Sequence, residues 1–508
     1  MVLFTNSIAY DALVFFVTLT VVVYAYFKWK YQYWKRKGLP YFVPKIPFGN
    51  FPNPLTSQLS MGEHIALLYK EAKARGWKGC GLYTMAVPIY MVLDMDLVKN
   101  IMTKDFNNFM DRGIYFNEKA DPISAHLFAI TGMKWKNLRA KLTPTFTSGK
   151  MKMMFQTMAD CGVILEKYIK DEVAGKQVVD IKDILGRFST DIIGSCAFGL
   201  DCNSFEQPNS PFRVYGKNVL ETSTLELIKE AFCISFPKAA RALSLRVFRK
   251  QACDFYTSVV HDTISYREKN SVKRNDFMQL LLEMKAKDDN ATENGNTLTM
   301  PEIIAQSFVF FIAGFETSST TMTFALFELA RNTAVQDKVR EEIRTVLAKH
   351  DNKVTYDSMN ELVYMKQVID ETLRMYPPVP LLTRESAEDY KIPGQDFILE
   401  KGTIVFIPAS GIHYDEDHYK NPKVFDPDRF SVENKKARHP YAHLPFGEGP
   451  RVCIGERFGI LQSKVGLTSI LKDFKVTLSE KTKLPLKMNP YEKITSPIGG
   501  IWLKIEKV

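Results

Sequence analysis

The sequence predicts a mainly α-helical body with small β-sheets, preceded by an N-terminal transmembrane helix. Three observations lead to this fold class. A continuous apolar stretch runs from Ile8 to Phe27, long segments between Leu55 and Met375 repeat apolar residues every three to four positions, and only two short regions have a strand-like pattern. A chain of 508 residues could form two domains, but no shift in composition separates the body into parts.

The stretch from Ile8 to Phe27 has the length of a membrane-spanning helix, since about 20 residues rising about 1.5 Å each match a hydrocarbon layer of about 30 Å. No basic residue precedes it and no small-residue cleavage site is evident, so a cleaved secretory signal is not expected. A buried N-terminal helix is the alternative. The basic cluster that follows places the body on the cytoplasmic side, and it consists of Lys28, Lys30, Lys35, Arg36 and Lys37.

These features divide the chain into a membrane anchor (residues 1–27), a basic and proline-rich hinge (28–50) and a catalytic domain (51–508). The basic cluster supplies five of the positive charges within ten residues, against a net charge of +10 for the whole chain. The remainder is only mildly basic, so we expect the lipid bilayer as a partner and no nucleic acid.

Within the body, strands are expected at Gly81–Met85 and Ile89–Leu93, and a hairpin at Asp396–Ile407 that turns at Lys401-Gly402. The polar segment Lys285–Thr297 is expected to be a linker or loop. The segment Phe232–Val247 mixes basic and apolar residues, which suits either a membrane-interface segment or a surface helix pair packed on the core.

The cysteines show no pattern of a disulfide framework or zinc site, because there is no CxxC pair and the eight histidines form no HExxH motif. We expect most of them to be small buried hydrophobic residues. Only Cys453 has unusual neighbours. The seven are Cys80, Cys161, Cys196, Cys202, Cys233, Cys253 and Cys453.

Three glycines and a proline surround Cys453 between Phe446 and Gly455, and such a segment forms a shaped loop. A helical pattern begins after Gly455, so the cysteine should lie at a helix N-terminus, where N–H groups stabilise a thiolate. We expect Gly449 and Gly455 to let backbone amides approach the sulfur. A phosphate-binding loop is excluded, since no Lys-Ser or Lys-Thr follows.

This loop resembles the haem-binding loop of the cytochrome P450 family. The resemblance implies the family's fold around a buried haem b (iron protoporphyrin), with Cys453 as the axial thiolate ligand of the iron. Phe446 belongs to the same loop, and Arg451 is expected to reach a haem propionate.

The long apolar helix that follows the capping pair Thr299 and Glu302 contains a second motif. A glycine inside a helix costs about 1 kcal/mol relative to alanine, so Gly314 needs a structural reason. The hydroxyl of Thr317 can bond the Ala313 carbonyl and bend the helix. The motif resembles the family's oxygen-binding helix, which implies that Glu316 and Thr317 deliver protons. A solvated helix face is the alternative.

Two further constellations match the family. Glu371 and Arg374 lie three positions apart on one helix with apolar flanks, which suggests a buried ion pair that Arg429 completes as structural scaffold. The second is expected to bind the haem propionates, although each arginine alone could be an ordinary surface residue. It consists of Trp135, Arg139 and Arg384, with Arg112 as a weaker addition.

The resemblance is strongest to insect microsomal members that oxidise foreign compounds. It implies a monooxygenase in the endoplasmic reticulum membrane that faces the cytosol and inserts one oxygen atom from O2 into apolar molecules such as plant toxins or insecticides. Electrons would come from NADPH-cytochrome reductase, with cytochrome b5 as a possible second donor, because the chain has no flavin or nicotinamide motif. Docking is expected near Cys453, through Lys134, Lys136 and Lys141.

Other functions remain open: hydroxylation of an endogenous lipid or hormone, a reductase-independent isomerase or dehydratase on the same scaffold, or a non-catalytic haem sensor or carrier. The intact Glu316-Thr317 pair argues against the isomerase or dehydratase. The substrate pocket is expected to include Phe116–Phe128, Phe308, Phe311, Ala313, Phe315, Val379–Leu382 and Pro497–Ile501.

Overall fold

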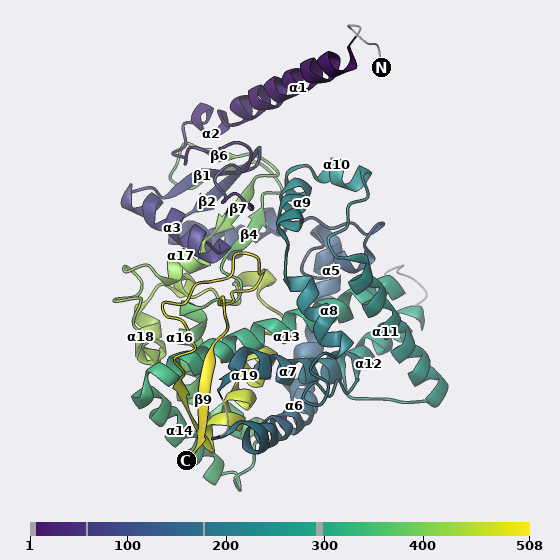
Figure 1. Ribbon diagram of the computed structural model, residues 1–508, viewed down its shortest axis with the longest axis vertical. Helices are drawn as coiled ribbons and strands as arrows, with labels where there is room; N and C mark the ends of the chain where they lie inside the picture. The colour runs from purple at the N-terminus through teal and green to yellow at the C-terminus, as the bar shows by residue number, and fades with distance from the viewer. Residues whose placement is uncertain (1–6, 57–58, 176–177, 291–297) are drawn as a thin grey trace.

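The computed structural model describes residues 7–56, 59–175, 178–290 and 298–508. Helix α1 (Ile8–Lys30) projects from the body (Figure 1), and its apolar side chains are exposed along most of its length. Among the described residues, α1 and the short helix α2 (Tyr33–Arg36) form the one continuous span that is long and apolar enough to cross a membrane. The N-terminal helix is therefore not a buried core element.

The chain after α1 packs against a four-stranded sheet. Trp34 is fully buried, and its indole N–H donates to the carbonyl of Leu82 at 2.9 Å. Tyr31 and Phe42 join the same apolar core. The sheet has the order β1-β2-β7-β4 and is antiparallel except between β2 and β7; the bounds are β1 (Gly79–Thr84), β2 (Val87–Val92), β7 (Ile404–Ile407) and β4 (Leu382–Glu385).

Two expectations for this region need correction. The first two strands are confirmed, but Asp396–Ile407 is not a hairpin. Although Gly402 turns the chain with a φ of 80°, β6 (Ile398–Leu399) pairs with β5 (Tyr390–Lys391), whereas β7 enters the larger sheet. The segment Lys285–Thr297 was expected to be a linker or loop, but its first part, up to Asn290, is the end of α12 (Phe277–Asn290). Residues 291–297 lie outside the described part.

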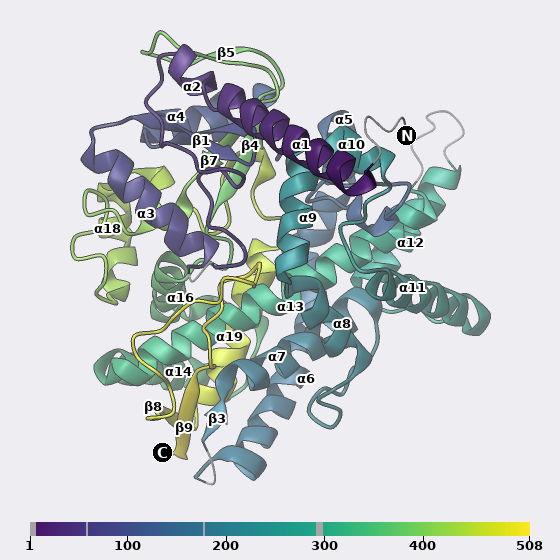
Figure 2. The same ribbon diagram turned by 45° about the horizontal axis from the view of Figure 1, so that its top comes forward.

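Helix α13 (Met300–Arg331) runs through the middle of the helical layer in both views (Figures 1 and 2). The predicted capping box is present, since Thr299 and Glu302 bond each other's backbone amides. Gly314 lies against α7 (Ile181–Ile193), where an added Cβ would stand 2.3 Å from the side chain of Ile193. Close helix packing is therefore the reason for this mid-helix glycine.

The remaining elements surround α13 and the sheets. The segment Phe232–Val247 includes the end of α9 (Thr224–Ser235) and all of α10 (Pro237–Ala242). Phe232, Leu245 and Val247 pack on a small core around Tyr115, whereas Leu243 is exposed.

The third sheet has the order β3-β9-β8. The helix bounds are α3 (Met61–Ala74), α4 (Met95–Lys99), α5 (Gly132–Leu142), α6 (Ser148–Tyr168), α8 (Pro211–Leu220), α9 (Thr224–Ser235), α10 (Pro237–Ala242), α11 (Lys250–Asn270), α14 (Thr333–Ala348), α15 (Tyr356–Glu361), α16 (Val363–Met375), α17 (Ala409–His413), α18 (Val432–Ala437) and α19 (Glu456–Leu471), and the third sheet comprises β3 (Val179–Asp180), β8 (Phe474–Leu478) and β9 (Trp502–Lys507).

Candidate active site

The loop around Cys453 is held by its own backbone. The amide of Cys453 donates to the carbonyl of Phe446 at 2.9 Å, and α19 begins at Glu456, just beyond the cysteine. Burial raises the pKa of the Cys453 thiol, and the backbone N–H of Gly455, which bonds the sulfur, opposes this rise. A thiolate at this position is therefore supported by the helix N-terminus.

The two glycines singled out in this loop have different roles. The N–H of Gly455 bonds the sulfur, as expected, but an added Cβ there would meet no atom within 4 Å, so space alone does not require a glycine. For Gly449 the structure shows a packing role. Its φ is 73°, and an added Cβ would lie 1.9 Å from the carbonyl oxygen of Met102, so glycine is required there to seat the loop against the preceding segment.

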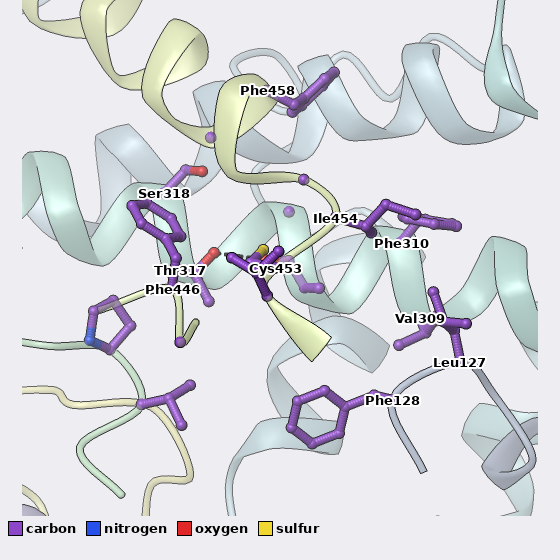
Figure 3. A pocket seen from close by; sticks show the side chains of 18 of the residues that line it. Leu127, Phe128, Val309, Phe310, Thr317, Ser318, Phe446, Cys453, Ile454 and Phe458 are labelled. Atoms are coloured by element: carbon purple, nitrogen blue, oxygen red, sulfur yellow. Dashed lines mark hydrogen bonds between the residues drawn. The ribbon is translucent and has the colours of Figure 1, made fainter. Parts of the chain in front are cut away.

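Cys453 faces a cavity that contains about 1790 Å³ of space free of protein atoms, counting its opening to solvent. Figure 3 shows Cys453 and Thr317 of α13 among the residues that line this cavity, together with Phe446, Phe128 and Val309. The other six cysteines are buried. Of these, only Cys196 also lines the cavity.

Four arginines from separate elements line the cavity, and no acidic residue lines it with them. Burial lowers the pKa of Arg384 to about 10 and that of Arg451 to about 9; at Arg451 the carboxylate of Asp111, 3.5 Å away, opposes this shift and the neighbouring arginines add to it. The Nε atom of Arg384 is buried without a hydrogen-bond partner. Such a cluster needs an anion, so a flat ligand with two carboxylates, such as haem b, fits this site. The four are Arg112, Arg139, Arg384 and Arg451.

Two of these arginines also hold the neighbouring chain. Arg451 donates to the carbonyls of Met110 and Ile130 at 2.8 Å each, and its guanidinium lies 4.3 Å from the ring centre of Trp135. Arg112 donates to the carbonyl of Arg451 at 3.1 Å. The sequence predicted only a propionate contact for Arg451. In the structure this side chain also holds the chain at Met110 and at Ile130.

The two residues of the predicted proton-delivery pair are oriented differently. Thr317 lines the cavity, and its hydroxyl donates to the Ala313 carbonyl at 2.5 Å, as expected. Glu316 is buried but does not line the cavity. It pairs with Lys182 of α7 at 2.9 Å, and Lys182 also bonds Glu492 at 3.1 Å.

A model of the cytochrome P450 family matches residues 47–505. The chain is 42% identical to cytochrome P450 6a2 of Drosophila melanogaster over 496 residues, which cover 96% of this chain and 98% of that protein. It is also 42% identical to cytochrome P450 6A1 of Musca domestica over 486 residues, covering 95% of each chain. The chain belongs to the cytochrome P450 family. It is a cytochrome P450 monooxygenase, and the family uses haem bound by a cysteine thiolate.

The scaffold of this cytochrome P450 behind the cysteine loop matches the expectation. Glu371 and Arg374 are fully buried on α16 and form two hydrogen bonds, at 2.7 and 2.8 Å. Arg429 approaches Glu371 to 3.4 Å as the third member. A bidentate pair with further hydrogen bonds is the arrangement that makes buried charges tolerable.

The predicted pocket is correct only in part. Leu127, Phe128 and Ala313 line the cavity, as do Val379, Leu381 and Leu382. Phe308, Phe311 and Phe315 instead pack in the aromatic core with residues such as Tyr256, and none of residues 497–501 lines the cavity. Helical periodicity identified the apolar helix but not which of its faces borders the cavity. The lining residues missed by sequence include Phe146, Ile193, Phe277, Val309 and Phe310.

Proposed function

We propose that Cys453 is the axial ligand of haem b and that this monooxygenase inserts one oxygen atom from O2 into apolar small molecules. The observation that carries the proposal is a cysteine beside a helix N-terminus, facing a cavity lined by four arginines and, among the described residues, by no acidic side chain; Asp111 pairs with Arg451 from outside this lining, at 3.5 Å. When bound, the haem supplies oxygen activation. The chain supplies the thiolate, the Gly455 N–H that stabilises it, and a largely apolar wall that limits water.

The arginines and aromatic residues would bind the rest of the cofactor. Arg384, with its unpartnered Nε, and Arg139 on α5 would each bond a propionate, while Arg112 and Arg451 would add charge as they hold the neighbouring chain. Trp135, against Arg451, and Phe446, at the start of the loop, would fix the plane of the ring.

On the opposite wall, Thr317 is the residue placed to hold a proton or a water molecule near the reacting oxygen. Its hydroxyl is bonded to Ala313, so it is fixed in orientation rather than free to rotate. Glu316 would act through water or after leaving Lys182, because it stands outside the cavity. In this proposal Glu316 takes up and passes on protons from behind α13.

Foreign compounds such as plant toxins or insecticides are the proposed substrates, because the wall near Thr317 is apolar and the relatives are insect proteins of the same family. Hydroxylation of an endogenous lipid or hormone is the second candidate, since the same wall suits it. An isomerase or dehydratase that needs no reductase is disfavoured by the placement of Thr317.

We place the enzyme in the endoplasmic reticulum membrane, with α1 as anchor and the catalytic domain in the cytosol. NADPH-cytochrome reductase would supply electrons, and cytochrome b5 is a second candidate donor. The proposed docking lysines are Lys134, Lys136 and Lys141 near α5; of these, Lys134 already pairs with Glu118 at 2.8 Å, so docking through it must displace that pair.

The test is a carbon monoxide difference spectrum of the reduced full-length protein, followed by turnover with the reductase and NADPH. Cys453→Ala should abolish the red-shifted Soret band of thiolate-ligated haem. Cys196→Ala is the matched control, because this cysteine lines the same cavity and should leave the band unchanged. A thiolate band that survives in Cys453→Ala would overturn the assignment, and turnover without reductase would favour the isomerase.

A further inference from the structure

We propose that His413 is a positioning residue that holds the Cys453 loop in ligating geometry by joining the end of α16 to the start of that loop. The proposal rests on the assignment of Cys453 as haem ligand. His413 ends α17 and is fully buried, and it does not line the cavity. It therefore acts through the backbone and not on the cofactor or substrate.

Both ring nitrogens of His413 bond the backbone. The amide of Leu444 donates to Nε2 at 2.9 Å, and Nδ1 lies 3.1 Å from the carbonyl oxygen of Arg374. An amide can only donate and a carbonyl can only accept, so Nε2 is unprotonated and Nδ1 carries the hydrogen. The ring is thus neutral and in a single tautomer, and its pKa is lowered well below the ordinary value, mainly by burial.

The bond to Leu444 fixes the chain that leads into the cysteine loop. The carbonyl of Leu444 accepts the amide of Gly447 at 3.1 Å, and the carbonyl of Phe446 accepts the amide of Cys453 at 2.9 Å. These two turns close the loop on itself. A shift at Leu444 would therefore pass to the Cys453 backbone, and hence to the direction of the sulfur.

The other end of this connection is rigid. Arg374 donates through Nη1 to the carbonyl of His413 at 2.8 Å while it is held by Glu371. Arg374 and His413, both fully buried, thus exchange side-chain-to-backbone bonds. This makes the buried ion pair of α16 the fixed point from which the ligand loop is placed.

A neighbouring histidine provides a matched control. His443 precedes Leu444, and its ring lies 5.6 Å from that of His413. Its Nε2 lies 3.1 Å from the carbonyl oxygen of Asp370, so it ties its own side chain to α16, whereas only His413 accepts the backbone amide of Leu444 that enters the loop. A general loss of packing in this region should affect variants of both histidines, whereas loss of positioning should affect only His413.

The experiment measures, in the full-length haem-loaded protein, the ratio of non-thiolate to thiolate Soret bands of the reduced carbon monoxide complex. His413→Phe removes both bonds and should raise this ratio about tenfold, the usual effect of losing a buried hydrogen bond. His413→Gln can still accept from Leu444 and should restore most of the thiolate band. His443→Phe should resemble the unsubstituted protein. In both His413 variants we expect the far-ultraviolet circular dichroism to be unchanged.

If His413→Phe does not fold, His413→Asn is compared with the unsubstituted protein in urea, and the thiolate band should be lost at lower urea than the circular dichroism. Equal ratios in His413→Phe and the unsubstituted protein, or coincident urea transitions in His413→Asn, would overturn the proposal. So would equal changes in His413→Phe and His443→Phe. Absence of a thiolate band from the unsubstituted protein would instead contradict the assignment of Cys453.

Discussion

The two walls of the cavity are built in different ways. The wall that carries Cys453 is a glycine-rich loop tied by buried hydrogen bonds to an ion pair, Glu371 and Arg374, that no solvent reaches. The wall that carries Thr317 is one face of a long helix, and its acid, Glu316, bonds a lysine behind the helix. The first wall holds its sulfur through buried backbone hydrogen bonds, whereas on the second the Thr317 hydroxyl is bonded to Ala313 and Glu316 to Lys182.

The largest expected effect tests the rigidity of the cysteine wall. Arg374→Ala leaves Glu371 buried with the Asp426 N–H and the more distant Arg429 as partners, so we expect a loss of about 3–5 kcal/mol in the free energy of unfolding. Arg344→Ala is the control, because Arg344 and Glu341 have the same spacing but side-chain exposures of 62% and 64%. This exposed pair should contribute less than about 1 kcal/mol. Urea unfolding measures both; equal losses would contradict the difference between buried and exposed pairs.

The second prediction concerns how the free energy of unfolding depends on pH, through two histidines behind the same wall. Burial lowers the pKa of His443 to about 3 and also lowers that of His413, so both rings stay neutral in the folded protein where an unfolded chain, with a pKa of about 6.5, takes up protons. The unfolded state then binds more protons, and stability falls as pH falls below about 6.5, by about 1.4 kcal/mol per pH unit for each ring.

The measurement is urea unfolding between pH 7 and pH 5. His443→Phe should remove about half of the steepening due to the two histidines, because only one of these two rings then takes up a proton on unfolding. An unchanged slope in this variant would show that other groups carry the acid sensitivity.

The third prediction concerns the helix wall. Thr317→Ala should keep the thiolate band but lower the share of NADPH electrons that reaches product by about tenfold, with peroxide in its place, because a positioned proton donor is lost. Thr323→Ala is the control, since Thr323 also bonds the carbonyl four residues earlier, at 2.7 Å, but is buried and does not line the cavity. Unchanged coupling in Thr317→Ala would remove the proposed role.

The cysteine wall could be predicted from the sequence because its function depends on short-range spacing. The loop, the start of α19 and the ion pair within α16 all involve residues a few positions apart, and the structure places them as expected. The predicted hairpin at Asp396–Ile407 failed for the opposite reason. Its local turn is present, but the strands pair with distant segments, and the sequence around a turn does not encode that choice.

The helix wall was predictable only as a helix. Periodicity shows that α13 has apolar faces, but all of its faces are covered, so the sequence could not distinguish Phe308, in the core, from Val309, at the cavity. The partner of Glu316, Lys182 on α7, lies over one hundred positions away, as does Glu492, which shares that lysine, and no local pattern connects them. His413 was missed because an isolated histidine has no spacing signal.

The smallest expected effect tests whether Glu316 contributes at all. Lys182→Met removes the cation between Glu316 and Glu492, without touching the cavity. If Glu316 supplies protons from behind the helix, electron coupling to product should change by roughly fivefold, less than for Thr317→Ala, because water can partly replace the lost ammonium. The solvent deuterium isotope effect on product formation should change with it, while the thiolate band stays.

Lys493→Met is the matched control for this last change. Lys493 follows Glu492 in the chain. It pairs with Glu230 of α9, at 2.5 Å, and not with Glu316. If Lys182→Met behaves like Lys493→Met in both coupling and isotope effect, the ion pair behind α13 is structural. The helix wall would then deliver protons through Thr317 and water alone, and the Glu316–Lys182 pair would serve only to hold α13 against α7.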